Sequence, residues 1–364
     1  MKRATHEEST KRIAKVRDFM DEKALDAVFY TSQENVFYLS GFTGYGDATL
    51  LITKKEQFIL TDFRYNEQVI VECPDYEHVN MRSDSMPATA DLMLSKGLRS
   101  VGFEDETILY TWVKSLAEEA PNIKFTGIGN FTEGLRIVKS EDELAKIEEA
   151  CRISSVAFAE TYEAVKPGMT EIEAAALLEY NMRKYGADGV AFTTIVASGI
   201  RGSMCHGTAT EKKLEEGEAV TVDFGARYKG YDADMTRTFF IGNANSKMRE
   251  IYQIVHDAQQ KAIDSFRVGM TGKELDAVAR DYISMHGFGK YFGHGLGHGV
   301  GIMIHEDPYV NLRGETPLTE GMVFSVEPGI YVPDLGGVRI EDLACVKNGK
   351  LHIMTFFDKE LKIK

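Results

Sequence analysis

Apolar positions in the first part of the chain follow helical and strand-like spacings in turn. Residues 8–22 have the three- to four-residue spacing of an amphipathic helix, carried by Ile13, Val16, Phe19 and Met20. The run AVFYT that follows is strand-like, and ATLLITKKEQFIL predicts a hairpin that turns at its Lys-Lys pair. Another strand is expected in GLRSVGFED, near residue 100, after a helix. Residues 1–132 are therefore predicted to form a small α/β domain.

A long helix is predicted to open the remainder of the chain. Ser140 stands before the stretch EDELAKIEEACRIS, and Glu143 follows it three residues later. This spacing is that of a capping box, which marks a helix N-terminus. Because 364 residues exceed what one ordinary hydrophobic core accommodates, we expect a second domain over residues 133–364.

The second region contains an internal repeat. VKPGMTEIEAAALLEYNMRKYG, residues 165–186, aligns with RVGMTGKELDAVARDYISMHG, residues 267–287. Further on, LEEGEAVTVDFG aligns with LTEGMVFSVEPG, so that Asp223 matches Glu327, and Asp234 then matches Glu341. Two successive matches in the same order indicate a duplication. A two-unit duplication predicts one closed, pseudo-symmetric domain and not an extended repeat array.

Each copy of the repeat ends in a predicted hairpin that carries two acidic residues. In EAVTVDFGARYKGYDADMTRTFF, the side chains alternate around a Tyr-Lys-Gly turn. If that turn centres on Tyr228 and Lys229, Asp223 and Asp234 lie directly opposite each other; a slip of one residue makes them diagonal neighbours on one face. In the second copy, Glu327 and Glu341 flank a loop centred on Asp334. Pseudo-symmetry would bring the two acidic pairs together.

The four acidic residues are notable because their strands are apolar. Taken singly, each could be an ordinary solvated strand residue. A charge in strands such as VTVDFG and FSVEPG is costly to bury, and like charges gathered there favour protonation unless cations neutralise them. A metal site resolves this conflict. Two metal ions at such a site would suit hydrolysis by a hydroxide that bridges them.

A glycine-rich stretch, YFGHGLGHGVGIMIHEDP, adds His294, His298 and His305 between five glycines. Alternating glycine permits close approach of another backbone. The stretch matches GxGxxG in no register, so a phosphate-binding loop is unsupported. A lone histidine is usually a satisfied core residue, but three histidines beside four paired acids favour a site. One imidazole with four carboxylates suits two divalent ions, with Mn²⁺, Co²⁺, Fe²⁺ and Zn²⁺ as candidates.

Composition narrows the cellular context. A net charge of −14 argues against nucleic acid and anionic membrane surfaces as partners. No apolar run reaches the roughly 18 residues of a membrane span, and the polar N-terminus lacks the apolar stretch of a signal peptide. The four cysteines are scattered, as expected of reduced thiols: Cys73, Cys151, Cys205 and Cys345. A cytoplasmic location is predicted.

These motifs carry a family resemblance. The segments VDFG, DADMTRT, GHGLGHGVG, VEPGIY and GGVRIED resemble those of the pita-bread metallopeptidases (family M24), which include aminopeptidase P, prolidase, methionine aminopeptidase and the metal-free creatinase. NVFYLSGFTG and TDFRY resemble the creatinase-type N-terminal domain of the proline-specific members, which methionine aminopeptidases lack. The resemblance implies an α/β (α+β) fold: a creatinase-type domain over 1–132 and a pseudo-symmetric pita-bread catalytic domain over 133–364.

The resemblance also implies a set of metal ligands. The five matching residues are Asp223, Asp234, His298, Glu327 and Glu341. Asp234 and Glu341 would bridge two divalent ions, with Mn²⁺ expected and Co²⁺, Zn²⁺ or Fe²⁺ as alternatives. Asp223 would complete one ion, and His298 with Glu327 the other. Glu327 would also act as the general base.

Other residues acquire roles only through the resemblance. Substrate binding and stabilisation of the tetrahedral intermediate would fall to three histidines that are not ligands: His206, His294 and His305. Arg339 would hold acidic ligands in place. Tyr331 is either a similar supporting residue or a packing residue.

The activity implied is hydrolysis of the bond between an N-terminal residue and a following proline, in small peptides with proline in second position. Dipeptidase-like members often carry an arginine just after the proline of HExP, whereas this chain has Tyr309 there and Arg313 as the nearest arginine. An Xaa-Pro aminopeptidase is therefore expected, with an Xaa-Pro dipeptidase (prolidase) as the alternative. A metal-free creatinase-like C–N hydrolase and a silent peptide-binding module are more remote, because the ligand series is intact. A homodimer is expected from the family.

Overall fold

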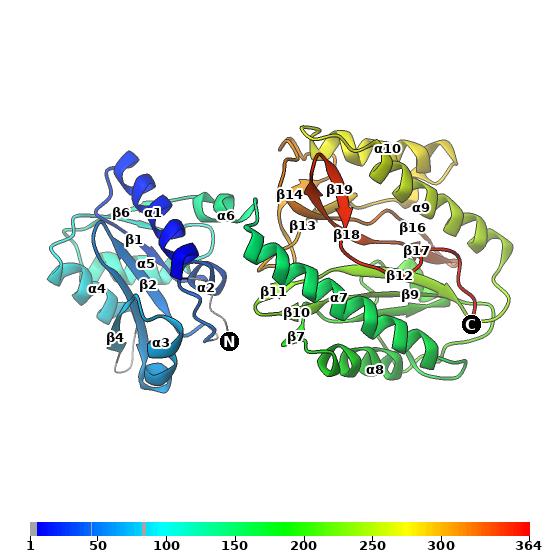
Figure 1. The fold of residues 1–364 in the computed structure, drawn as a ribbon, viewed down its shortest axis with the longest axis horizontal. Coiled ribbons are helices and arrows are strands. Elements are labelled where there is room, and N and C mark those ends of the chain that lie inside the picture. Colours follow the sequence, from blue (N-terminus) through cyan, green and yellow to red (C-terminus); the bar gives the residue numbers. More distant parts are fainter. Residues whose placement is uncertain (1–5, 45, 82–84) are drawn as a thin grey trace. The chain divides into compact units, whose positions relative to one another are not determined.

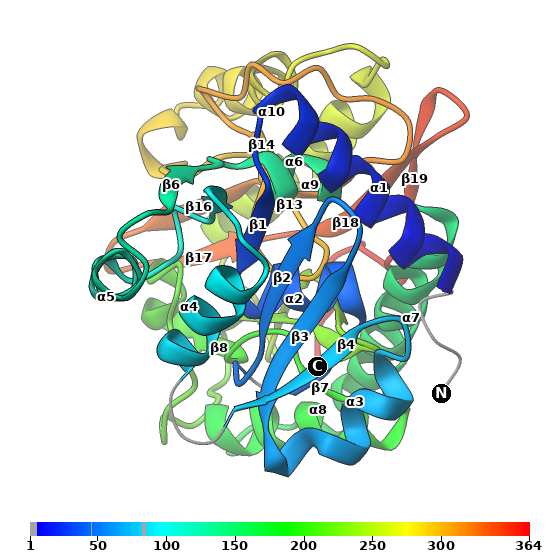
Figure 2. The same cartoon turned by 90° about the vertical axis from the view of Figure 1, so that its left-hand side faces the viewer.

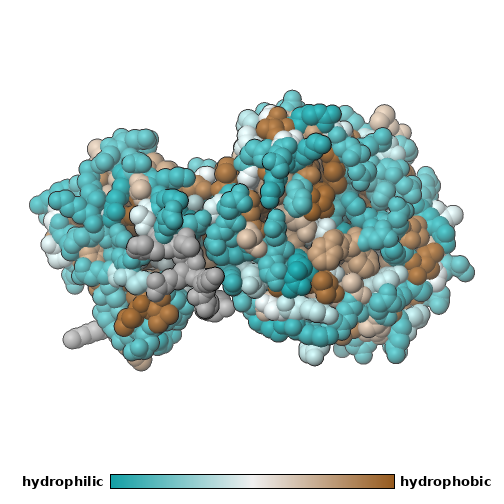
Figure 3. Space-filling model, in the orientation of Figure 1, coloured by the Kyte–Doolittle hydropathy of each residue, from teal (hydrophilic) through white to brown (hydrophobic). Residues whose placement is uncertain are grey.

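The chain divides into two compact units, Met1–Leu135 and Arg136–Lys364 (Figure 1). The computed structural model describes residues 6–44, 46–81 and 85–364. The expected boundary after residue 132 lies three residues before this division. Within the described residues, no helix has the length and apolar character needed to cross a membrane. On the face drawn in Figure 3, hydrophilic residues cover most of the surface and apolar residues form separate patches.

The first unit is a six-stranded mixed sheet in the order β4-β3-β2-β1-β5-β6 (Figure 2). The strands are β1 Ala27–Tyr30, β2 Thr49–Thr53, β3 Gln57–Asp62, β4 Glu77–Met81, β5 Ser100–Phe103 and β6 Lys124–Gly127. The helices are α1 His6–Glu22, α2 Gln33–Ser40, α3 Asn66–Glu72, α4 Ser85–Ser95, α5 Tyr110–Glu119 and α6 Phe131–Arg136, with a short 3-10 helix at Phe63–Tyr65. β2 and β3 join through a hairpin at the Lys-Lys pair, with Ile52 opposite Gln57. The predicted first helix, hairpin and strand near residue 100 are thus confirmed.

Both faces of this sheet are buried. On one face, Phe29, Leu51 and Phe58 form a core with apolar residues of α4 and α5. The alternating residues Val28, Leu50 and Ile52 are equally inaccessible on the other face, and α1 contacts β1 and β2. A strand buried on both faces reads as a continuous apolar run, as AVFY does.

The second unit opens with the predicted long helix, α7 Glu141–Ala164, and its capping box is formed. The Ser140 hydroxyl accepts from the Glu143 amide, and the Glu143 carboxylate accepts from the Ser140 amide. The remaining helices are α8 Glu171–Lys184, α9 Ser246–Ser265 and α10 Gly272–Met285, with 3-10 turns at Gly199–Ser203 (η2) and Gly289–Tyr291. Figure 1 shows these four helices outside the strands, with α7 and α8 on one side and α9 and α10 on the other.

The repeat in the sequence is a repeat in the structure. α8 and α10 each begin with a capping box, built by Thr170 with Glu173 and by Thr271 with Glu274. Before each helix a glycine has positive φ, 86° at Gly168 and 90° at Gly269, a conformation that favours glycine. Two apolar cores follow the repeat, one formed mainly with α7 and α8 and the other with α9 and α10. The predicted pseudo-symmetric duplication is confirmed.

The strands between the helix pairs carry the site. In the first half they are β7 Gly189–Val190, β8 Ile195–Ser198, β9 Ala219–Phe224, β10 Ala226–Tyr228, β11 Tyr231–Asp232 and β12 Met235–Phe240. In the second they are β13 Gly297–Gly299, β14 Glu306–Val310, β15 Val323–Val326, β16 Gly329–Val332, β17 Gly336–Arg339, β18 Asp342–Lys347 and β19 Lys350–Ile353. The sheets next to the site run β12-β9-β8 and β14-β13-β15-β18-β19.

The register of the first hairpin decides between the two predicted alternatives. Tyr228 pairs with Tyr231, so the turn centres on Lys229 and Gly230 and not on Tyr228 and Lys229. Both turn residues have positive φ, which the tight turn requires and which Gly230 supplies without strain. Asp223 therefore lies opposite Thr236, and Asp234 is its diagonal neighbour.

The second hairpin has the predicted register. Val326 pairs with Asp342 and Gly329 with Arg339. Continued between these pairs, the same register sets Glu327 across from Glu341. The connecting loop is centred on Asp334, whose φ is 60°.

Substitution of Gly272 by alanine should destabilise the second unit. A Cβ there would stand 2.1 Å from the carbonyl oxygen of Tyr309, a backbone atom that cannot swing away. We expect the free energy of unfolding to fall by about 1–3 kcal/mol, measured by denaturant unfolding or scanning calorimetry of the full chain. Gly189→Ala is the matched control, since nothing lies within 4 Å of its added Cβ. Equal melting temperatures for the two variants would contradict this packing.

Candidate metal centre

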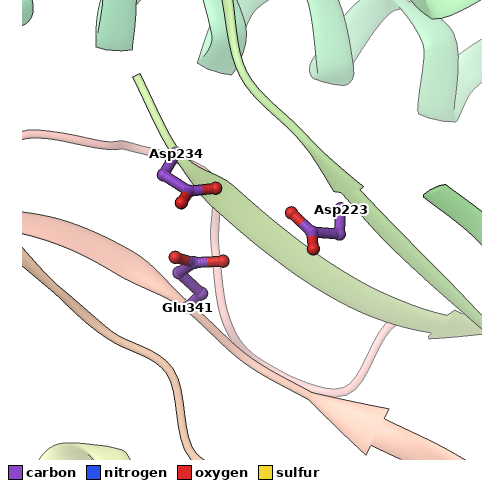
Figure 4. Close-up of side chains that lie close together, drawn as sticks. All are labelled: Asp223, Asp234 and Glu341. Atoms are coloured by element: carbon purple, nitrogen blue, oxygen red, sulfur yellow. The ribbon is translucent and has the colours of Figure 1, made fainter. Parts of the chain in front are cut away.

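Three carboxylates from separate strands converge in the second unit (Figure 4). Asp223 is the penultimate residue of β9, Asp234 immediately precedes β12, and Glu341 immediately precedes β18. One oxygen of each lies within 4.8 Å of the others. Asp234 and Glu341 are 4% and 1% exposed, so this charge is shielded from water.

His298 and Glu327 complete the cluster. The Nε2 atom of His298, in β13, is 3.6 Å from Asp234 Oδ2 and 3.3 Å from Glu327 Oε1. Its Nδ1 atom lies 3.1 Å from the Gly299 carbonyl oxygen, which holds the ring with Nε2 toward the acids. The structure thus places the five predicted ligands around one point.

The glycines around His298 allow backbones to approach on both sides of β13. A Cβ on Gly297 would stand 1.9 Å from the Ser325 carbonyl oxygen, in β15. A Cβ on Gly299 would stand 2.2 Å from the Asp307 carbonyl oxygen, in β14. His298 is therefore carried on a strand that only glycine permits to fit between these neighbours.

Without a cation, the buried carboxylates of the cluster repel one another. Burial, and then the charge of the neighbouring acids, raises the pKa of Asp234 and of Glu341 well above ordinary carboxylate values. Burial also raises the pKa of Asp223, although Arg339 opposes the rise.

Glu327 and His298 behave as an ion pair. Burial alone would raise the pKa of Glu327, but the hydrogen bond and charge of His298 outweigh it and lower that pKa to about 2. The pKa of His298 is raised in return, because Glu327 outweighs the effect of burial. Protonated His298 thus offsets part of the negative charge, in the position where a cation would be held.

Two buried oxygens show that the acids fit a metal. Among the described residues, Asp223 Oδ1 and Glu341 Oε1 have no hydrogen-bond partner. The second oxygen of each is occupied, by Arg339 Nη2 at 2.6 Å from Asp223 Oδ2 and by Thr236 Oγ1 at 2.6 Å from Glu341 Oε2. A buried carboxylate oxygen without a donor is unfavourable, and a divalent cation would satisfy both. Carboxylates with one imidazole suit Mn²⁺, Co²⁺, Fe²⁺ or Zn²⁺.

Arg339 links the acids to the histidines. Besides Asp223, it donates to Thr236 Oγ1 at 3.0 Å and to the Tyr331 hydroxyl at 2.8 Å. The same hydroxyl lies 2.9 Å from His294 Nε2. Of the two roles considered for Tyr331, the structure therefore favours support of the site over packing alone.

The other predicted histidines border the cluster. The ring of His305 lies 4.2 Å from that of His298, centroid to centroid, and His305 and His206 are exposed. Burial lowers the pKa of His294, and partial loss of solvent, followed by the charges of His298 and His206, lowers that of His305. His294 and His305 are accordingly neutral near pH 7. The N–H of His294 is on Nδ1 and donates to the Gly295 carbonyl oxygen at 2.8 Å, whereas that of His305 can donate to a ligand.

Sequence reasoning missed two hydroxyl groups. Thr236 donates to Glu341, and Ser325 donates to Glu327 Oε1 at 3.1 Å. Each lies two residues from a predicted ligand, Asp234 or Glu327, and the period of a strand places such residues on one face. The two-residue spacing from a predicted ligand was the sequence signal that could have identified both hydroxyl groups.

Comparison with protein families decides the assignment. The model described as metallopeptidase family M24 matches residues 145–348, and that of the creatinase/prolidase N-terminal domain matches residues 12–138. The chain belongs to metallopeptidase family M24. A metallopeptidase family implies divalent metal ions, in agreement with the carboxylate cluster.

Individual M24 relatives align over nearly the whole chain. An Xaa-Pro dipeptidase from Pyrococcus horikoshii is 38% identical, covering 96% of this chain and 98% of its own. The structure of an Xaa-Pro dipeptidase from Bacillus anthracis is 40% identical, with a TM-score of 0.94 over 98% of this chain and 100% of that one. The structure of an X-Pro aminopeptidase from Thermotoga maritima is 37% identical, with a TM-score of 0.91 over 97% and 99%. The expected pita-bread fold with its N-terminal domain is confirmed.

The stability of this M24 protein should depend on pH through Glu341. Its pKa is raised in the folded state, so the stability it contributes is present below the unfolded-state pKa and is lost as pH rises through the folded pKa. In metal-free protein, Glu341→Gln should therefore raise the melting temperature relative to wild type more at pH 8 than at pH 5.

Added Mn²⁺ should reverse this order at pH 8. Binding to the folded state raises the melting temperature of wild type, whereas Glu341→Gln, which lacks a ligand oxygen, should gain little. Thermal melts with and without Mn²⁺, with metal analysis, provide the measurement. Glu211→Gln, at an exposed acid, should differ from wild type by the same amount at both pH values. A metal response in Glu341→Gln equal to that of wild type would refute the site.

Proposed function

We propose that this protein is an Xaa-Pro dipeptidase, a prolidase, which uses two divalent metal ions. The observation that carries the proposal is the buried cluster of Asp223, Asp234 and Glu341 with its unpartnered oxygens. It occurs in a chain 40% identical, over 98% of its length, to an Xaa-Pro dipeptidase. These relatives support the alternative raised above better than the aminopeptidase first expected. The aminopeptidase was expected because Tyr309 stands where dipeptidase-like members often carry an arginine. The side chain of Tyr309 is 43% exposed.

The residues that would hold the metals are those predicted. Asp234 and Glu341 would bridge two ions, Mn²⁺ by expectation, with Asp223 on one and His298 and Glu327 on the other. Bound there, divalent cations would supply hydroxide at neutral pH and polarise the scissile carbonyl. The positions of these carboxylates in the fold would determine where the hydrolysis takes place.

The chain's own groups supply proton transfer and orientation. Glu327, whose Oε1 accepts from the Ser325 hydroxyl at 3.1 Å, would be the general base that accepts a proton from the attacking water. Neutral His305 would donate a hydrogen bond to the oxyanion that forms at the carbonyl. His294, whose Nδ1–H donates to the Gly295 carbonyl oxygen at 2.8 Å, would act through the Tyr331 hydroxyl, which lies 2.9 Å from its Nε2. Arg339 would keep Asp223 ionised and oriented through their 2.6 Å contact.

Proline imposes its own requirement on recognition. The Xaa-Pro bond has no N–H, so the site cannot hold it by the usual backbone hydrogen bond. Recognition must use the shape of the ring and the charged ends of the substrate. Among the described residues, no hydrogen bond occupies the exposed imidazole of His206 or His305, which leaves both for substrate.

An Xaa-Pro aminopeptidase is the second candidate. It is favoured by the 37% identity to the X-Pro aminopeptidase of Thermotoga maritima and by Tyr309, in place of an arginine, after the HEDP motif. The two activities share the metal centre and differ in whether the proline carboxylate of the substrate is free.

Hydrolysis of Ala-Pro and of Ala-Pro-Ala by Mn²⁺-loaded protein distinguishes these candidates. A dipeptidase should have a kcat/KM at least about tenfold higher for Ala-Pro, equivalent to one charge-assisted hydrogen bond to the free carboxylate. Ala-Ala serves as the control for the proline requirement. Chelation should abolish turnover and Mn²⁺ should restore it. Preference for Ala-Pro-Ala would establish the aminopeptidase, and activity that survives chelation would exclude both.

A further inference from the structure

A buried carboxylate outside the metal centre, that of Glu171, is tied to the segment that carries His206. Glu171 is the first residue of α8 and is completely inaccessible to solvent. One oxygen, Oε1, accepts from the amide and hydroxyl of Ser198 at 2.8 and 2.9 Å. The other, Oε2, accepts from the amide and hydroxyl of Thr210 at 3.1 and 2.7 Å and from Arg201 Nε at 3.3 Å.

These contacts fix the segment 198–210 at both ends, through Ser198 and Arg201 near its start and Thr210 at its end. Arg201, held by Glu171, also donates through Nη2 to the Thr208 carbonyl oxygen at 2.7 Å, across the residues that flank His206. Five hydrogen bonds to one buried carboxylate make a strong constraint, since charge-assisted bonds are stronger than neutral ones.

The segment also touches the metal centre. The carbonyl oxygen of Cys205, next to His206, accepts from Arg339 Nη1 at 3.2 Å, and Arg339 holds Asp223. Gly202 packs against β17, where a Cβ on Gly337 would stand 2.0 Å from the Gly202 carbonyl oxygen. A shift of the segment would therefore change the position of His206 relative to the acids.

Comparison of the two repeats separates Glu171 from the ordinary needs of its helix. Capping boxes start both α8 and α10, and in both repeats the helix N-terminus bonds to the following loop, with Ile172 N donating to Thr210 O at 3.0 Å and Lys273 N to Gly314 O at 2.8 Å. The residue that matches Glu171 in the second repeat is Gly272. A carboxylate is thus not required to cap the helix or pair it with the loop.

We propose that Glu171 is a positioning residue for the peptidase reaction, which sets His206 at the substrate side of the metal centre by clamping residues 198–210. The assignment rests on the proposed function, because His206 acts only if the centre hydrolyses peptides. Glu171 itself contacts neither metal ligands nor substrate and acts through the segment.

A double-mutant cycle between Glu171→Gln and His206→Ala tests the assignment. Glutamine keeps the shape of the side chain but replaces one accepting oxygen with a donor. With Mn²⁺-loaded protein and Ala-Pro and Ala-Pro-Ala as substrates, Glu171→Gln should lower kcat/KM by about 10- to 100-fold through misplacement of His206. In the His206→Ala background, the same change should lower it no further, because coupled residues are not additive. Metal content should equal that of wild type.

Matched variants keep the test decisive. Glu173→Gln, on the same helical turn, weakens the capping box but leaves the segment 198–210 alone, so kcat/KM should stay within about twofold of wild type while stability falls by roughly 1 kcal/mol. If Glu171→Gln does not fold, Thr210→Val removes one donor and should show a smaller loss with the same dependence on His206.

The outcomes separate the two levels of inference. Loss of activity that is equal with and without His206, or unchanged activity in Glu171→Gln and Thr210→Val, overturns the positioning role while wild type remains a peptidase. Metal-loaded wild type that hydrolyses neither Xaa-Pro peptide overturns the proposed function and this role with it.

Discussion

Repulsion among buried carboxylates is the interaction on which the rest of the structure depends. Asp223, Asp234 and Glu341 share a region nearly closed to solvent, and there each charge raises the cost of the next. Within the described centre, Arg339 and protonated His298 compensate only part of this charge, as the raised carboxylate pKa values show. Additional cations would therefore stabilise the folded state. Metal binding and folding are linked for this reason.

The duplicated scaffold meets that demand with two hairpins that are not identical. In the first, a two-residue turn at Lys229 and Gly230 makes the acids diagonal neighbours. In the second, a longer loop around Asp334 keeps the register that sets Glu327 across from Glu341. The first hairpin carries aspartates and the second glutamates, whose side chains are one methylene longer. Pseudo-symmetry supplies four carboxylates, and these differences give the two acidic pairs different geometries from one motif.

What could be predicted from the sequence is what local patterns determine. Capping boxes, alternating strands and the repeat depend on neighbouring residues, so the helices, the hairpins and the residues that cluster in the candidate site could be predicted. The centre of the first turn was left open because Tyr-Lys-Gly permits two centres, and only the φ requirement at Gly230 selects between them. Thr236 on Glu341 and Glu171 on Thr210 join residues 105 and 39 positions apart, which no local pattern reveals. Assembly as a homodimer and location in the cytoplasm stay predictions.

The glycine-rich strand explains why His298, the proposed metal ligand, and His305, the proposed substrate-side residue, are held together. β13 carries His298 between β15 and β14, at separations that leave no room for a Cβ at Gly297 or Gly299. His305 directly precedes β14, and its ring rests on that of His298. Glu306, the next residue, is anchored in a buried ion cluster at 2.7 Å from both Arg136 Nη2 and Lys139 Nζ.

Displacement of His305 would therefore require either separation of two closely packed strands or disruption of a buried ion cluster, and both are costly. His206 lies in the first half of the repeat and is not next to a glycine-rich strand of this kind. Its segment is held by the side-chain carboxylate of Glu171 instead. Each half of the domain thus carries an exposed imidazole on a constrained backbone. Backbone packing supplies the constraint at His305, and the buried carboxylate of Glu171 supplies it at His206.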